Sequence, residues 1–218
     1  MKIKLIGAIA IALLTSACAT VEHKPMTKEA SEALRERSLI QSQYEKADFV
    51  AFTAGKAAFA MLGAVAAISE GNEIVTENDI ADPAIAISKG LADKLTSTRS
   101  VKTVSSQIVA KSDSLDDLVK TYIGADYILD IKTFGWMFLY YPTDWSHYKV
   151  QYSARLRLID TSTKQVIAET MCQTVQGDDK NPPTKDQLLE NKASLLKSYL
   201  SKATDGCIEV LSKDVLML

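Results

Sequence analysis

The 218-residue chain is poor in the residues on which most catalytic and metal sites depend, with only two histidines and three cysteines. His23 and His147 lie far apart in the sequence, and no two cysteines have the CxxC spacing of zinc or redox sites. GxSxG, HExxH and phosphate-binding glycine-loop motifs are absent as well. Asp178 and Asp179 stand beside prolines and indicate a solvated loop. We therefore expect no enzyme activity, no cofactor and no metal.

The sequence also lacks an excess of basic residues, because 25 Lys and Arg face 27 Asp and Glu and the net charge is -2. Nucleic-acid binding depends on concentrated Lys and Arg, so it is not expected. Apolar residues make up 47% and charged residues 24%, an ordinary globular balance. The length predicts one domain with an added segment.

The N-terminus carries an export signal. Lys2 and Lys4 precede an uncharged apolar run, Leu5–Leu14, which is too short to span a bilayer as a permanent helix. The small residues at 15–17 suit a signal peptidase, and Cys18 follows them at once. Residues 1–17 are therefore predicted to be a signal peptide that is removed.

The same residues resemble the lipobox of bacterial lipoproteins, with the usual leucine at Leu14, one place further from Cys18 than is common. The resemblance implies a lipid attached to Cys18, as palmitate-type acyl chains that anchor the protein stably. The alternative is an ordinary cleaved signal followed by a chance cysteine. Because Ala19 is not the aspartate that marks inner-membrane retention, we expect an outer-membrane anchor facing the periplasm.

Cys172 and Cys207 are the remaining thiols. In an oxidising compartment an even pair predicts a disulfide bond, and two buried free thiols are the alternative. Closing a loop of about 35 residues would stabilise the fold by roughly 3 to 4 kcal/mol.

The mature chain is expected to have three parts: a lipidated tether at 18–30, an N-terminal segment at 31–81 and an α/β domain at 82–218. Around the start of the second part, Glu29–Arg37 favours helix and Ser38–Tyr44 a short strand.

The Ala/Gly-rich stretch Phe49–Ile68 is charged only at Lys56. We predict a single helix, buried in the domain or packed on a partner, which ends at Glu70-Gly71-Asn72. Membrane contact and an irregular glycine-rich loop are the alternatives. Lys56 weighs against a membrane span, because a charge at the bilayer centre costs about 2.5 kcal/mol or more.

Hydrophobic periodicity predicts the elements of the α/β domain. Asp82-Pro83 opens a helix to about Ser97, and Ser114 caps another that stops at Gly124. The other predicted elements are strands at 101–105, 127–134, 148–158 and 166–174 and a long helix at 185–213. The fold class is therefore α/β (α+β), a single mixed or antiparallel sheet of about 4–5 strands covered by helices on one face, with the extra Ala/Gly-rich helical segment.

Alternation is clearest in the strand 148–158, which predicts one buried and one wet face. The residues expected to face water are Lys149, Gln151, Ser153, Arg155 and Arg157.

The segment Gly124–Met171 resembles the sheet of a lipoprotein domain shared by the curli-secretion pore subunit and the N-terminal domain of TolB. The match lies in GADYILDIKTF and in the hairpin YSARLRLIDTSTKQVIAE, where Lys164-Gln165 replaces the usual turn glycine. The resemblance covers about half of the mature chain, and its motifs are structural. It implies an α/β fold and a role through assembly, as a scaffold, accessory subunit or regulator of the cell envelope.

Aromatic residues concentrate at 134–148, around a turn at Pro142-Thr143-Asp144. Such side chains favour a protein interface or a membrane interface. A cap on the core and a ligand or glycan pocket are the alternatives. The predicted partner-binding residues are Trp136, Phe138, Tyr140, Tyr141 and Trp145.

These observations favour a non-enzymatic, membrane-anchored periplasmic lipoprotein that acts as a scaffold or accessory subunit of an envelope protein assembly. It would bind an envelope protein or itself. An oligomeric, membrane-inserting lipoprotein of the secretion type is the alternative, and a periplasmic enzyme comes third.

Overall fold

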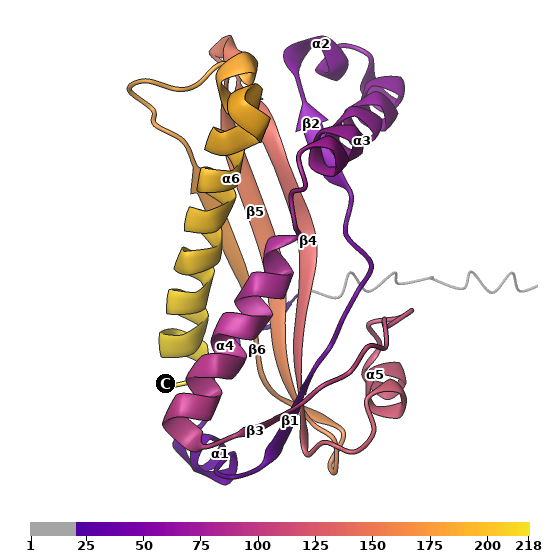
Figure 1. Ribbon diagram of the computed structural model, residues 1–218, viewed down its shortest axis with the longest axis vertical. Coiled ribbons are helices and arrows are strands. Elements are labelled where there is room, and N and C mark those ends of the chain that lie inside the picture. The colour runs from indigo at the N-terminus through magenta and orange to yellow at the C-terminus, as the bar shows by residue number, and fades with distance from the viewer. Residues whose placement is uncertain (1–20) are drawn as a thin grey trace, which may run out of the picture.

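The computed structural model describes residues 21–218, so the signal peptide and Cys18 lie outside the described residues. The fold is built on a mixed six-stranded sheet (Figure 1). Its main part is an antiparallel meander of β4 (Tyr127–Tyr141), β5 (Asp144–Asp160) and β6 (Gln165–Gln176). The strand order is β3-β1-β4-β5-β6, and β2 also pairs with β4. The predicted α/β class is confirmed.

Three short parallel strands extend the meander on its β4 side. β1 (Ser38–Gln41) pairs with the beginning of β4 and with β3 (Lys102–Val104). β2 (Phe49–Phe52) pairs with the far part of β4, where Phe49 lies opposite Trp136. The chain between β1 and β2 therefore passes a stretch of β4 that neither strand reaches.

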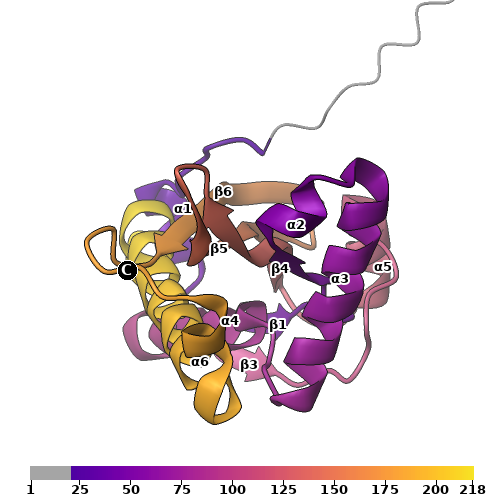
Figure 2. The ribbon, with the colours of Figure 1, turned by 90° about the horizontal axis from the view of Figure 1, so that it is seen from above.

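Helices α4 (Pro83–Arg99) and α6 (Lys185–Val210) lie side by side on one face of the sheet, as Figures 1 and 2 show. Asp82 caps α4 by accepting a hydrogen bond from the Ala84 amide, and Pro83 occupies the first turn. Thr184 and Gln187 form a capping box at the start of α6. The predicted starts of both helices are confirmed.

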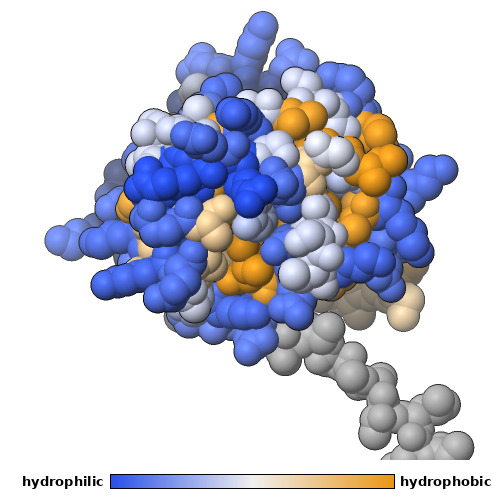
Figure 3. Space-filling view, turned by 90° about the horizontal axis from the view of Figure 1, so that it is seen from below, coloured by the Kyte–Doolittle hydropathy of each residue, from blue (hydrophilic) through white to orange (hydrophobic). Residues whose placement is uncertain are grey.

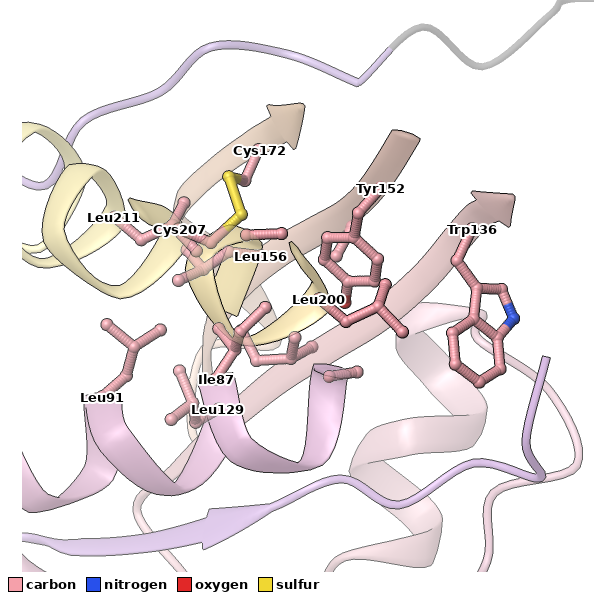
Figure 4. Packing of buried hydrophobic residues seen from close by; sticks show 14 of the residues in the cluster. Ile87, Leu91, Leu129, Trp136, Tyr152, Leu156, Cys172, Leu200, Cys207 and Leu211 are labelled. Carbon is pink, nitrogen blue, oxygen red and sulfur yellow. A yellow bond between two sulfur atoms is a disulfide. The ribbon is translucent and has the colours of Figure 1, made fainter. Parts of the chain in front are cut away.

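The interior between these helices and the sheet is the main core (Figure 4). Leu129, Leu156 and Tyr152 point from the strands toward Leu91 and Leu200 of the helices.

The other face of the sheet is covered only at one end. There α5 (Leu115–Thr121), capped by Ser114, packs in a smaller apolar cluster with residues of β1 and β4. At the same end α1 (Lys28–Ala33) precedes β1, while α6 leads into a π-helical turn, Leu211–Val215.

The tether predicted at 18–30 is too long. Lys24 exchanges backbone hydrogen bonds with Glu169 at the edge of β6, and Met26 is buried in the core. Thr27 caps α1 by accepting from the Ala30 amide. The prediction is wrong for residues 24–30 because an apolar side chain and an edge-strand pairing fix them to the domain.

The Ala/Gly-rich stretch is not a single helix. It begins as strand β2, because Phe49 and Ala51 alternate into the core, and Thr53 then caps the one-turn helix α2 (Ala54–Ala57). Helix α3 (Ala60–Glu77) follows and runs through the predicted stop at residues 70–72. Gly71 is needed there because a Cβ would collide with the carbonyl of Phe49, so the glycine marks close packing of α3 on β2.

Candidate interaction surface

Trp136 and Phe138, predicted to bind a partner, have no exposed surface. The Trp136 ring meets Phe49 edge to face at 5.1 Å between centroids, and its Nε1 donates a 3.0 Å hydrogen bond to the carbonyl of Ala47. Phe138 packs in the same way on Tyr148, at 5.4 Å. The partner-binding prediction is wrong for these two residues, and the core alternative describes them.

The physical reason is a β-bulge in β4. The register shifts between Thr133 and Gly135, so one extra residue resets the alternation and turns Trp136 toward the core. The aromatic segment thereby continues a 15-residue strand instead of forming a projecting tip.

The remaining aromatic residues of the hairpin differ in exposure. Tyr140 is half-buried and stacks on Phe52, with 6.2 Å between ring centroids. The hydroxyl of Tyr141 donates to Asp179, and partial burial together with this carboxylate raises the pKa of Tyr141. Trp145 is largely open, with 68% of its surface exposed, and Phe134 at the other end of the aromatic segment is 51% exposed. Partner binding through Tyr140, Tyr141 and Trp145 stays a prediction.

Four of the most exposed bulky apolar side chains gather between α2 and the first turns of α3, in a segment that the sequence predicted to be buried or partner-packed. Phe59, Met61, Leu62 and Val65 are 65% to 82% exposed. Ala58, Ala60, Ala64 and Ala66 are exposed between them. We call these eight residues the α2–α3 apolar surface. Residues 57–69 contain no charged residue.

The α2–α3 apolar surface projects because α2 supports the first turns of α3. Gly63 of α3 lies against the backbone of Lys56 so closely that a Cβ would collide with its carbonyl oxygen. The helical pair stands at one end of the molecule, beside the β4–β5 hairpin (Figures 1 and 2). Helix α2 and the last residues of β4 are therefore neighbours at this end of the molecule.

The charged side chains nearest to this surface form ion pairs with one another at its base. The amine of Lys56 binds the carbonyl of Ala51 and the carboxylate of Glu70, and Lys185 of α6 binds the same carboxylate. Partial burial acts to raise the pKa of Glu70, but the hydrogen bonds from Lys185 and Lys56 outweigh it and lower that pKa. The ion pairs leave the projecting turns apolar.

The opposite end of the molecule also exposes hydrophobic residues, but they stand among hydrophilic ones (Figure 3). Ile108 and Val109 border a shallow hollow that is shared with Lys111, Asp117 and Lys120. Ile123, close to this hollow in the sequence, is 81% exposed. The α2–α3 apolar surface differs in degree, because its four bulky apolar side chains are each at least 65% exposed, whereas Ile108 and Val109 are 53% and 43% exposed.

A groove of about 930 Å³ lies beside α4, where β4 has no partner between β1 and β2. Its lining mixes hydroxyl and amide side chains with apolar and charged ones. Asp82 at its floor is buried and already accepts from the Ala84 amide and from the Thr133 hydroxyl.

Arg155 and Arg157, expected to face water, are buried around Asp130. Arg157 lies 2.8 Å and Arg155 3.4 Å from the Asp130 carboxylate. The carboxylate also accepts from Ser42 and from Tyr44, and burial followed by the charge of Asp130 raises the pKa of Tyr44 far above its ordinary range. The wet-face prediction is wrong here because residues 42–44 and 113 fold over the arginines.

The predicted disulfide between Cys172 and Cys207 is present and joins β6 to α6, with 5.7 Å between the Cα atoms (Figure 4). His23 contacts the hydroxyl of Thr170, and His147 contacts Asp144. Within residues 21–218 no group of three or more His, Cys, Asp or Glu side chains is placed to hold a metal ion. No helix in this part of the chain is both long and apolar enough to cross a membrane.

No protein-family model matches the sequence, and no curated protein matches it. Several solved structures are weakly similar. A PelC dodecamer from Paraburkholderia phytofirmans is 12% identical, with 86% of this chain and 96% of that chain covered and a TM-score of 0.35. A hypothetical protein from Chlamydia trachomatis is 8% identical, with 81% and 96% covered and a TM-score of 0.37.

A lipoprotein from Neisseria meningitidis is 14% identical, with 79% of this chain and 98% of that chain covered and a TM-score of 0.29. The similar structures thus include a bacterial lipoprotein. Similarity this low carries no conclusion about function, and the resemblance to the curli-secretion and TolB domains stays a prediction.

Proposed function

We propose that this chain is a non-enzymatic accessory lipoprotein of the bacterial cell envelope, anchored through Cys18 to the outer membrane and facing the periplasm. In its working state another component of the envelope covers the α2–α3 apolar surface. The observation that carries the proposal is this uncharged, projecting surface with Met61 82% exposed.

An exposed surface of this kind has a free-energy cost that a binding partner removes. Burying apolar area contributes about 25 cal/mol per Å², so four bulky side chains left in water represent several kcal/mol of unused stabilisation. Contiguous apolar patches on monomers are frequently functional for this reason. The core already has Trp136 and Phe138 beneath this end, so the outer residues are not needed to complete it.

Thiol accessibility tests the proposal. Met61→Cys and Ile123→Cys replace side chains of nearly equal exposure, 82% and 81%, at opposite ends of the molecule. The native disulfide keeps Cys172 and Cys207 from reacting. In isolated envelopes a water-soluble maleimide should label position 61 much more slowly than position 123, while both label equally in detergent-purified protein. Equal labelling in envelopes would overturn the proposal.

A further inference from the structure

We propose that the component covering the α2–α3 apolar surface is the lipid bilayer itself, in which this end of the protein inserts to interfacial depth. The inference rests on the proposed function and names its partner. Three observations support it: the shape and composition of the surface, the side of the molecule from which the anchor leaves, and the position of the nearest charges.

The surface is convex and uncharged. Residues 58–62 and 64–66 are exposed in succession, so the first turns of α3 present apolar side chains on almost all sides. A flat or concave apolar face suits a second protein, whereas a projecting apolar turn can displace lipid without leaving polar side chains unpaired. Amphipathic helices bind membranes in this way, with their apolar face about 5–10 Å into the headgroup and acyl boundary.

The length of chain before the domain brings the bilayer close. Lys24 is fixed to Glu169 by backbone hydrogen bonds, and Cys18 precedes it by six residues. Six extended residues reach about 20 Å at most. A lipidated Cys18 therefore holds Lys24 within about that distance of the membrane surface. In Figure 2, which looks along the long axis, the first described residues and the beginning of α3 lie toward the same side, although along that axis Lys24 enters the sheet level with Asp130 and not at the α2–α3 end (Figure 1).

The charges and backbone groups set the depth of insertion. Lys56, Glu70 and Lys185 form a connected ion-pair group at the base of the surface, which suits the headgroup region. Phe59, at the start of α3, provides no side-chain cap, so the first amides of the helix need acceptors. Lipid phosphate and ester oxygens supply acceptors at the interface, while the hydrocarbon centre does not.

Trp145 lies on the β4–β5 hairpin at the same end and is 68% exposed. Tryptophan is enriched at membrane–water interfaces, where its ring sits at headgroup level. It would be a second contact with the bilayer beside the α2–α3 apolar surface.

The test uses the full lipidated protein in vesicles of phosphatidylethanolamine and phosphatidylglycerol that contain no other protein. An environment-sensitive nitrobenzoxadiazole label is placed on Met61→Cys, on Leu62→Cys and on the control Ile123→Cys. Lipids brominated on their acyl chains should quench the labels at 61 and 62 several-fold more than the label at 123. A retained melting temperature shows that each labelled protein is folded.

Equal quenching at 61, 62 and 123 would overturn the bilayer proposal. If position 61 is protected in native envelopes but unquenched in these vesicles, the cover is another protein and only the bilayer proposal fails. If position 61 is open in both preparations, the proposed function fails with it.

Discussion

The two tryptophans of this chain, nine residues apart in one hairpin, have opposite roles. Trp136 is fully buried against Phe49 of β2, while Trp145 is largely exposed and bonds only to the carbonyl of Pro142 within the described structure. Burial, and not the type of side chain, therefore decides what a substitution at each position does.

Replacing Trp136 by Ser should lower the free energy of unfolding by about 3–5 kcal/mol, because a large cavity opens and the Nε1 partner of Ala47 is lost. Trp145→Ser is the matched control and should change it by less than about 0.5 kcal/mol. Urea titration followed by circular dichroism measures both. Similar effects of the two substitutions would contradict the burial of Trp136 described here.

The contribution of Asp130 to stability also depends on its buried partners. Asp130→Ala should destabilise the protein by about 3–5 kcal/mol, since buried Arg157 loses its counter-charge and buried Arg155 keeps only Asp113. The control, Asp93→Ala, removes an exposed i,i+4 pair with Lys89 and should cost less than about 1 kcal/mol. Denaturant midpoints at constant slope would show the difference. A small effect at Asp130 would mean that water already solvates the arginines.

At the scale of elements, helix α3 depends on a close approach to β2. Gly71→Ala should destabilise the protein by about 1–3 kcal/mol or more, because the added Cβ collides with the carbonyl of Phe49 and pushes the helix away. Gly55→Ala, on helix α2, meets nothing within 4 Å and should be neutral or slightly stabilising. Thermal unfolding distinguishes the two. Equal melting temperatures would contradict the packing of α3 on β2.

Elements with strong local signals were predictable from the sequence. Asp82-Pro83, Ser114 and Thr184 each begin a helix because a side-chain oxygen satisfies free amides of the first turn. The turn of the β5–β6 hairpin was also placed correctly, although Lys164 there adopts a positive φ of 54° that glycine would favour. Lys164 therefore adopts the left-handed backbone conformation at the turn position where the resembled family usually has glycine.

Elements that depend on distant contacts were not predictable. Phe49–Phe52 is a strand only because β4 offers a free edge beside Trp136, a neighbour 87 positions away in register. Gly135 suits the bulge after Thr133, but only the pairing of β4 with β5 fixes its position, and it turns Trp136 and Phe138 inward. Propensity describes neighbours in sequence, so pairing between remote segments overrides it.

At the scale of the whole molecule, ion pairs connect elements that also share an apolar core. Glu70 links α3 to α6 through Lys185, and Asp113 ties the loop before α5 to Lys132 and Arg155 of the sheet. Burial opposes ionisation of both carboxyls, but their cationic partners lower each pKa below its ordinary value.

Stability should therefore fall in acid. A lowered folded-state pKa gives stabilisation that is complete above the unfolded value, 4.5 for Glu70, and is lost as the pH falls through the folded value. The unfolding free energy of the wild type should decline below about pH 4.5, and Glu70→Gln should make that decline shallower. Glu77→Gln, exposed on the same helix, is the control. An unchanged acid profile in Glu70→Gln would contradict the role of Glu70.

The sequence alone determined the features that depend on local order and composition. Periodicity and capping predicted the α/β class, the meander of long strands and the helix starts. The oxidising compartment and the even number of remaining cysteines predicted the pairing of Cys172 with Cys207. Tertiary structure alone decided which apolar residues remain in water. The sequence does not distinguish a hydrophobic side chain that fills the core, such as Phe138, from one that projects into water, such as Met61 of the α2–α3 apolar surface. Only the packing of neighbouring elements fixes where each side chain points, and that packing places the exposed group at the end of the molecule where we expect the membrane.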